Sequence, residues 1–262
     1  MNYDEAYANA PFIPGADDFP PAWAARSTAL RDRLGERFRA GLRYGPAPRN
    51  WMHLCLPDTA PRGLAVIVHG GYWLRFSPDD FAHLAQGALA RGWAVALPAY
   101  TLAPAARISE ITAEIGAALS VAAGEVAGPI CLAGHSAGGH LAARMACVDA
   151  PLPAAVAERI TRCLPVSPVA DLRPLRRCSM NADLRLDGAE AWAESPVLLP
   201  PRPGVAAHVW VGGAERPVFL DQARRLGNAW ACPVTVEPAR HHFDVIEGFE
   251  QADSALMAAF LG

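Results

Sequence analysis

The 262-residue sequence has no block of basic residues, and its formal charge is only −3. Binding to nucleic acid or to an anionic membrane surface ordinarily depends on clustered lysine and arginine side chains. We therefore expect no nucleic-acid partner and no membrane partner, and we expect a small molecule as the substrate. The sequence leaves the oligomeric state open, with a homodimer as one option.

Cysteine pairs with metal-binding or redox spacing are also missing. The cysteines are scattered without a C-x-x-C pair, and most lie in apolar runs: Cys55, Cys131, Cys147, Cys163, Cys178 and Cys232. Isolated cysteines of this kind are typical of reduced side chains that pack as small hydrophobic groups. We expect neither a disulfide framework nor a metal site.

No stretch has the features of a signal peptide or of a membrane span. The first five residues, MNYDE, contain neither a basic start nor an apolar run, and no apolar stretch is long enough to cross a bilayer. The 52% of apolar residues are enough for a sizeable core. We expect one cytoplasmic domain over residues 1–262.

Strand and helix patterns alternate from residue 64 to the end of the chain. Mostly apolar segments predict strands at residues 64–68, 93–97, 130–133, 163–166, 207–211 and 233–237, and the continuous apolar run at 64–68 is typical of a strand buried on both faces of a parallel sheet. This alternation predicts an α/β fold with a mainly parallel central sheet and helices on both faces. In such sheets the functional residues lie on loops at the carboxyl ends of the strands.

Two regions depart from this rhythm. Residues 1–43 are predicted to form an N-terminal arm and a helix, with the first 25 residues extended over the body because they are rich in proline and aromatic side chains. The amphipathic helix is predicted over residues 23–39. Residues from about 170 to 204 carry several prolines and many arginines. We expect this segment to be a small cap insertion that contains the residues that define the substrate.

A glycine-rich turn, Gly134-His135-Ser136-Ala137-Gly138, lies between a predicted strand and a predicted helix. This is the context in which a G-x-S-x-G nucleophile elbow occurs. Glycines are needed there because the serine takes a strained backbone angle and its neighbours leave no room for a Cβ atom. We expect Ser136 to be the nucleophile and the Ala137 N–H to stabilise the oxyanion.

A serine nucleophile requires an acid and a histidine further along the chain. His241 and His242 follow the last predicted strand, where the base belongs, whereas His208 opens a strand. Glu215, in the loop after the preceding strand, is favoured as the acid, and Asp221 in the next helix is its competitor. A glutamate near a helix N-terminus also interacts favourably with the helix dipole, so a structural role for Glu215 stays open.

The loop after the first central strand reads His69-Gly70-Gly71-Tyr72-Trp73. Its glycines allow the main chain to approach a substrate closely. We expect the Gly71 and Tyr72 N–H groups to complete the oxyanion hole with Ala137. Tyr72 and Trp73 are candidates for an aromatic substrate pocket, with anchoring of the loop as the alternative.

Together these motifs resemble the kynurenine formamidase branch of the α/β-hydrolases, which is related to the hormone-sensitive-lipase-like esterases. The matching segments are the HGGxW loop at 69–73, Y-x-L-x-P at 100–104, the elbow at 134–138, and the runs at 171–175, 215–219 and 242–243. The resemblance covers nearly everything from Tyr44 onward. One departure is that the eukaryotic members have aspartate at the acid position, where this chain has Glu215.

The resemblance implies a triad of Ser136, His242 and Glu215. It implies a cofactor-free serine hydrolase that cleaves an aryl formamide, such as N-formylkynurenine, or a small carboxylic ester through an acyl-enzyme. It assigns structural roles to the remaining conspicuous histidines, His69, His135 and His140. The alternatives are an esterase or thioesterase of another pathway, and a ligand-binding protein that has kept the fold without turnover.

Overall fold

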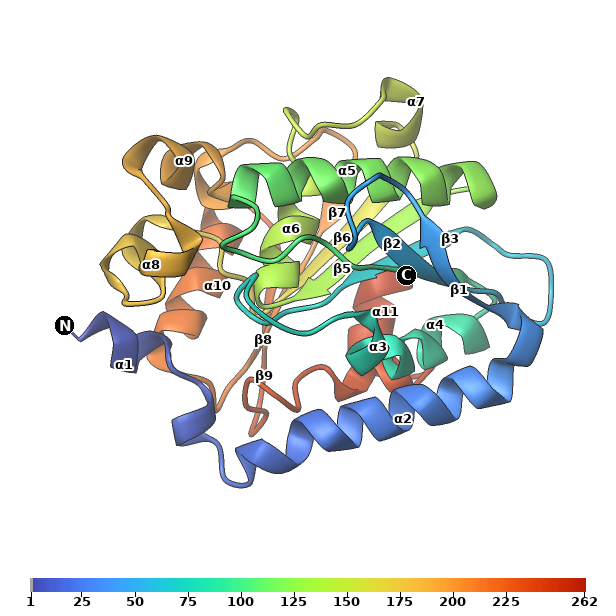
Figure 1. Cartoon of the computed structure of the whole chain (residues 1–262), viewed down its shortest axis with the longest axis horizontal. Coiled ribbons are helices and arrows are strands. Elements are labelled where there is room, and N and C mark those ends of the chain that lie inside the picture. Colours follow the sequence, from blue (N-terminus) through green and yellow to red (C-terminus); the bar gives the residue numbers. More distant parts are fainter. Residues whose placement is uncertain (1) are drawn as a thin grey trace.

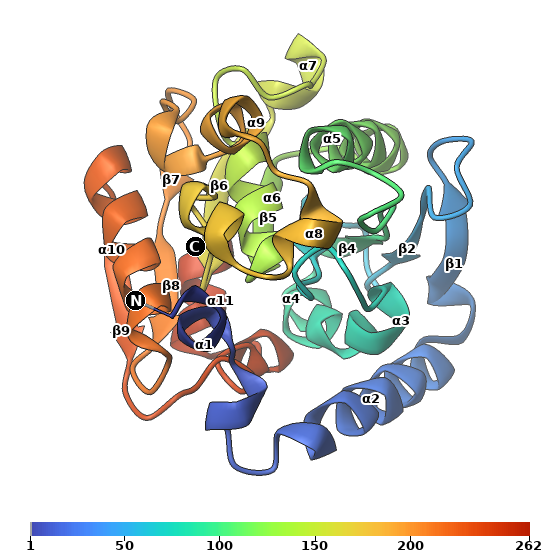
Figure 2. The same ribbon diagram turned by 60° about the vertical axis from the view of Figure 1, so that its left-hand side comes forward.

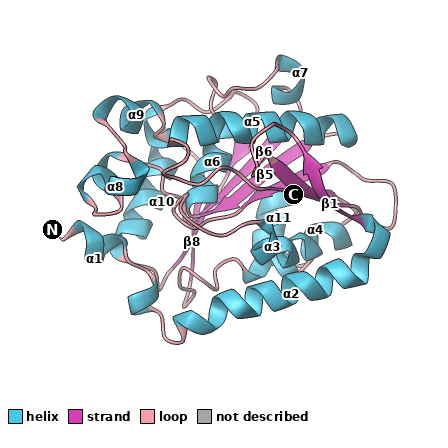
Figure 3. Cartoon of the chain, in the orientation of Figure 1, coloured by secondary structure: helices cyan, strands magenta, loops and turns pink. Residues whose placement is uncertain are grey.

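The computed structural model describes residues 2–262 and has a central twisted sheet between two layers of helices (Figures 1 and 3). The strand order is β1-β2-β4-β3-β5-β6-β8-β9, with β7 paired to β6. The strands are β1 (Phe38–Arg43), β2 (Trp51–Cys55), β3 (Leu64–Val68), β4 (Ala94–Pro98), β5 (Ile130–His135), β6 (Ile160–Val166), β7 (Ala206–Ala207), β8 (Val209–Gly212) and β9 (Val234–Glu237). β2 is antiparallel to both β1 and β4, and the other pairings are parallel. The predicted fold class is confirmed.

Helices cover both faces of the sheet (Figure 2). The α-helices of the described residues are α1 (Tyr3–Tyr7), α2 (Phe19–Leu34), α3 (Pro78–Phe81), α4 (Gln86–Ala90), α5 (Ile108–Glu125), α6 (Ala137–Met145), α7 (Ala154–Ala157), α8 (Asn181–Leu184), α9 (Gly188–Ala193), α10 (Pro217–Trp230) and α11 (Ala255–Leu261). In β3, Val66 belongs to the buried cluster that includes side chains of α5, α6 and α10, while its neighbour Ile67 belongs to the cluster that includes side chains of α2, α3, α4 and α11. A strand covered on both sides must be apolar at every position, which explains the continuous apolar runs.

The N-terminal region differs from the prediction in two ways. The predicted helix at residues 23–39 starts and ends earlier, as α2, and Gly35 ends it with a φ of 54°. Phe38–Arg43 then forms the edge strand β1, which was not predicted because most of its side chains are exposed and show no alternation. The preceding arm is not extended, since it folds into α1 and two 3-10 helices, η1 (Ala10–Phe12) and η2 (Ala16–Asp18).

The segment interpreted as a cap consists of short elements. It contains α8, α9 and the 3-10 helices η5 (Arg173–Arg177) and η6 (Pro196–Leu198). Glu190 of α9 accepts a hydrogen bond of 2.6 Å from Arg107, the residue that precedes α5. Glu194, just after α9, pairs with Arg144 of α6 at 3.0 Å. One ion pair with an exposed arginine and one buried ion pair therefore hold this segment against α5 and α6.

Over residues 2–262, no helix has the length and apolar character needed to cross a membrane. The same part of the chain contains no cluster of three or more histidine, cysteine, aspartate or glutamate residues with the geometry to hold a metal ion. All six cysteines are free, and every one except the half-buried Cys232 is buried. Their burial agrees with the prediction that they pack as small hydrophobic groups.

Candidate active site

Ser136 lies at the turn between β5 and α6, with φ 56° and ψ −115°. An added Cβ at Gly134 would clash with the carbonyl oxygen of Gly138, and one at Gly138 would clash with the carbonyl oxygen of Val68. The Ser136 N–H donates to Val166 O of β6 at 2.9 Å, which fixes the turn to the neighbouring strand. The structure thus has the strained strand–turn–helix geometry that a nucleophile elbow requires.

Glu215 and His242 meet at the carboxyl end of the sheet. His242 Nδ1 lies 2.6 Å from Glu215 Oε2, and the carboxylate is completely buried. Its other oxygen accepts hydrogen bonds from Gly212 N, at 2.8 Å, and from the Ser167 hydroxyl. A carboxylate that accepts from every neighbour requires the proton of His242 on Nδ1, and this leaves Nε2 as the basic nitrogen.

The structure separates the two competing residues from this pair. The Asp221 side chain is 65% exposed on α10 and faces Arg225 at 3.8 Å. His241 Nδ1 lies 3.1 Å from Asp244 Oδ1 and accepts a hydrogen bond from the Asp244 N–H. Neither Asp221 nor His241 contributes to the Glu215–His242 contact.

The His242 ring is held by two other rings. The His135 ring lies 4.6 Å from it and the Phe219 ring 4.3 Å, between centroids. Burial lowers the pKa of His135 well below its usual value, so this neighbour stays neutral and does not repel a protonated His242. Ser136 and His242 line the same cavity, and the hydrogen bonds of the described residues include none between them. Catalytic hydrogen bonds of this kind are often long until a substrate binds.

The loop after β3 presents its main chain to the same cavity. Gly71 has φ 107° and Tyr72 has φ 53°, so both lie in the left-handed region. Within residues 2–262, the N–H groups of Gly71, Tyr72 and Ala137 have no hydrogen-bond acceptor. These three predicted oxyanion donors are therefore unpaired in the described residues, and Gly71 and Tyr72 also line the cavity.

His69 supports this loop from inside the protein. Its Nδ1 lies 2.8 Å from Gly70 O, and its ring stacks on Tyr100 at 4.3 Å. Burial lowers the pKa of His69 to about 3, so the ring is neutral. These contacts agree with the structural role that the resemblance assigns to His69.

Trp73 does not line the cavity, and its prediction as a pocket residue is wrong. A positive φ of 58° turns its side chain into the core, where it is fully buried and packs edge-to-face on His140 at 5.1 Å. His140 is itself fixed by a hydrogen bond of 2.6 Å to Glu194 O. Tyr72, in contrast, lines the cavity as predicted.

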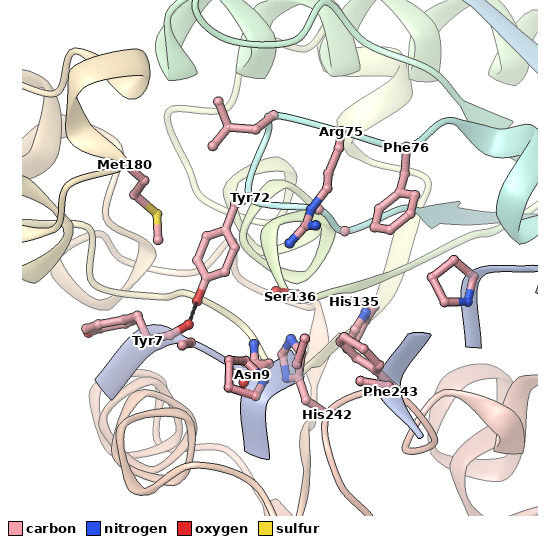
Figure 4. A pocket seen from close by; sticks show the side chains of 18 of the residues that line it. Tyr7, Asn9, Tyr72, Arg75, Phe76, His135, Ser136, Met180, His242 and Phe243 are labelled. Atoms are coloured by element: carbon pink, nitrogen blue, oxygen red, sulfur yellow. Dashed lines mark hydrogen bonds between the residues drawn. The ribbon is translucent and has the colours of Figure 1, made fainter. Parts of the chain in front are cut away.

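The cavity has a volume of about 420 Å³ and opens above Ser136 (Figure 4). The segment that we expected to define the substrate, residues 170–204, supplies only Ser179 and Met180 to its wall. The largest share comes from the first 23 residues: Asp4, Tyr7, Ala8, Asn9, Ala10, Pro11, Ala16, Asp17, Pro20 and Trp23. No local pattern in the sequence predicted this, since proline and aromatic residues indicate that a segment is anchored but not which surface it covers.

Hydrogen bonds fix the N-terminal segment, residues 2–18, over the cavity. The Tyr72 hydroxyl donates to Tyr7 O at 2.7 Å, and Gln222 Nε2 of α10 donates to the Tyr7 hydroxyl at 2.9 Å. The Ser179 N–H donates to Asp4 Oδ1 at 2.6 Å. The segment is thereby joined to the loop after β3, to α10 and to residues 170–204.

A family model described as the alpha/beta hydrolase fold matches residues 65–242. The chain belongs to this family. The α/β-hydrolase chain is 26% identical over 234 residues to the kynurenine formamidase of Salmo salar, and this alignment covers 83% of this chain and 79% of that protein. It is 28% identical over 178 residues to the kynurenine formamidase of Danio rerio, which covers 66% of this chain and 60% of that protein.

Solved structures of other hydrolases share the fold. A provisionally assigned thioesterase from Silicibacter sp. TM1040 is 50% identical, with a TM-score of 0.98 and complete coverage of both chains. An inhibited esterase B from Lactobacillus rhamnosis is 20% identical, with a TM-score of 0.67 and 91% coverage of each chain. This α/β-hydrolase therefore resembles esterases and thioesterases, and its identity to kynurenine formamidases is distant.

Proposed function

We propose that the protein is a serine hydrolase that cleaves a small acyl compound, an aryl formamide or a carboxylic ester, through an acyl-enzyme at Ser136. The contact that carries the proposal is the 2.6 Å hydrogen bond between Glu215 and His242 in the wall of the cavity that Ser136 also lines. A buried acid–histidine pair beside an elbow serine is the arrangement that activates a hydroxyl for nucleophilic attack.

In the first half-reaction, His242 Nε2 takes the proton of Ser136 as Oγ attacks the substrate carbonyl. The developing oxyanion accepts hydrogen bonds from the N–H groups of Gly71, Tyr72 and Ala137. Glu215 stays ionised and stabilises the protonated imidazole through Nδ1. When the tetrahedral intermediate collapses, His242 gives its proton to the leaving nitrogen or oxygen.

In the second half-reaction, water replaces the leaving group. His242 takes a proton from this water as its oxygen attacks the acyl carbon bound to Ser136. The second tetrahedral intermediate collapses to the free acid, and His242 returns the proton to Ser136 Oγ. Each residue thus ends the cycle in the protonation state in which it began.

Two observations bear on the substrate. The cavity wall contains six aromatic side chains, which suits an aryl group: Tyr7, Trp23, Tyr72, Phe76, Phe81 and Phe243. Together with the identity to kynurenine formamidases, this supports an aryl formamide such as N-formylkynurenine. The 50% identical protein that is assigned as a thioesterase supports thioester cleavage as the second candidate.

The test compares kcat/KM on N-formylkynurenine, 4-nitrophenyl acetate and an acetyl thioester, for the wild type and for Ser136→Ala. We expect turnover of at least one substrate by the wild type and a loss of about 10³-fold or more in the variant. Equal rates for the two proteins would contradict the proposal. The ranking of the three substrates decides between formamidase, esterase and thioesterase.

A further inference from the structure

The cavity wall contains polar atoms that are buried and have no hydrogen-bond partner among residues 2–262. They are Asn9 Oδ1, Trp23 Nε1 and His135 Nε2. All three residues line the cavity and are over nine-tenths buried, with exposed fractions of 8%, 2% and 6%. Native proteins leave few buried polar atoms unpaired, because each one costs the full desolvation of its group. Three such atoms around one cavity point to a ligand that supplies hydrogen bonds there.

Asn9 is the most informative of the three. It belongs to the N-terminal segment, and Figure 4 shows it among the side chains that surround Ser136. The main-chain carbonyl oxygen of Asn9 accepts a hydrogen bond from the Phe12 N–H at 2.9 Å. The main-chain carbonyl oxygen of Tyr7, two residues earlier, accepts one from the Tyr72 hydroxyl. The backbone on both sides is thus fixed, and the carboxamide is presented at a defined place.

We propose that Asn9 is a specificity-determining residue that forms a hydrogen bond with a polar group of the substrate remote from the scissile carbonyl. Because Asn9 Oδ1 is an acceptor, the preferred substrate then carries a hydrogen-bond donor, a hydroxyl or an N–H group, on its acyl part or on its leaving part. This inference rests on the proposed function and concerns the same cavity.

The physical basis is the cost of an unpaired amide. Asn9 Oδ1 is already shielded from water, and a purely alkyl substrate placed against it leaves it unpaired. A substrate with a hydroxyl or N–H group at this place supplies the missing hydrogen bond. Sites built to bind a polar group therefore discriminate strongly against analogues that lack it.

The kinetic test uses matched substrates that differ by one hydroxyl group. The acyl-side pair is 4-nitrophenyl hexanoate and 4-nitrophenyl 6-hydroxyhexanoate, and the leaving-side pair is pentyl acetate and 5-hydroxypentyl acetate. Asn9→Leu keeps the branched shape of the side chain and removes both hydrogen-bonding atoms. We expect the ratio of kcat/KM, hydroxyl over alkyl, to fall about tenfold in this variant for at least one pair.

A stability measurement distinguishes this role from a structural one. Asn50 is a matched control, since it is also buried but fully paired, accepting from Ala47 N at 3.0 Å and donating to the Tyr44 hydroxyl at 3.4 Å. We expect Asn50→Leu to lower the Tm, because it leaves those partners unpaired. Asn9→Leu should leave the Tm unchanged or raise it, since it removes an unpaired polar group from a buried wall.

The two measurements together overturn or support the inference. A hydroxyl-to-alkyl ratio that changes less than threefold for both pairs, or a Tm of Asn9→Leu lowered as much as that of Asn50→Leu, would overturn it. Failure of the wild type to turn over any of the four esters, N-formylkynurenine or the acetyl thioester, or equal rates in Ser136→Ala, would instead contradict the proposed function. A changed ratio with an unchanged Tm is the result that we expect.

Discussion

The hydroxyl of Tyr72 donates a hydrogen bond of 2.7 Å to the carbonyl oxygen of Tyr7. This bond joins the loop that carries the candidate oxyanion donors to the segment that covers the cavity. The N–H of Tyr72 is unpaired within the described residues, while its side chain is bonded to the N-terminal segment. The same bond orders the chain that leads to Asn9.

Tyr72→Phe removes this bond and leaves the main-chain N–H in place. We expect kcat/KM to fall about tenfold, chiefly through a higher KM, because the N-terminal segment loses one of its attachments while the oxyanion hole keeps its donors. Tyr44→Phe is the matched control, since the Tyr44 hydroxyl donates to Ala99 O at 2.6 Å away from the cavity. It should lower stability to a similar degree and leave kcat/KM unchanged, and a similar loss of activity in both variants would count against the role of Tyr72.

Glu215→Gln tests the assignment of the acid. The amide carries no negative charge to stabilise a protonated His242, so kcat should fall by about 10² to 10⁴. Glu215→Asp should recover part of that loss. Asp221→Asn is the control on the exposed side of α10, and its rate should stay within about tenfold of the wild type. If Asp221→Asn were inactive and Glu215→Gln fully active, the assignment of the acid would fail.

His242→Gln and His241→Gln form a second matched pair. We expect the first to abolish turnover, because it removes the nitrogen that accepts the Ser136 proton. The second should retain most of the activity, since His241 contacts Asp244 and the Phe19 ring instead of Glu215. The measurement is kcat at saturating substrate, and an inactive His241→Gln beside an active His242→Gln would reverse the assignment.

Much of the fold and of the site could be predicted from local patterns. A strand such as Leu64–Val68 is buried on both faces, so every residue in it is apolar and the pattern is visible. The elbow is visible because Gly134 and Gly138 have no room for a Cβ atom. Glu215 is favoured because it follows a recognisable strand, and only the resemblance distinguishes His242 from His241 after the last strand.

Other features depend on information that is not local. β1 is an edge strand whose residues are mostly exposed, so its pairing with β2 leaves no periodic pattern. The side chain of Trp73 points into the core because of a positive φ, which its residue type does not reveal. The N-terminal segment covers the cavity through contacts with residues such as Tyr72 and Gln222, which lie far away in the sequence.

Three buried histidines give the stability a predictable dependence on pH. Burial lowers the pKa of each to about 3, and they are His69, His83 and His140. In the unfolded chain the same groups bind protons below about pH 6.5. The folded state is thus favoured fully above that pH and loses stability as the pH falls from about 6.5 toward 3, by on the order of 1 kcal/mol per pH unit for each histidine.

Urea unfolding at pH 7.5 and pH 5.5 checks this expectation. The free energy of unfolding should be lower at pH 5.5, and His83→Gln, which lies outside the cavity, should reduce the difference between the two values. Equal stability of the wild type at the two pH values would contradict it.

The most direct test of the catalytic assignment is labelling with a fluorophosphonate followed by peptide mapping. Such reagents react with a serine that is activated by a neighbouring base. We predict that Ser136 alone is modified. Neither Ser136→Ala nor His242→Gln should be labelled, although both remain folded. Modification of Ser167 or of a cysteine, or undiminished labelling of Ser136→Ala, would contradict it.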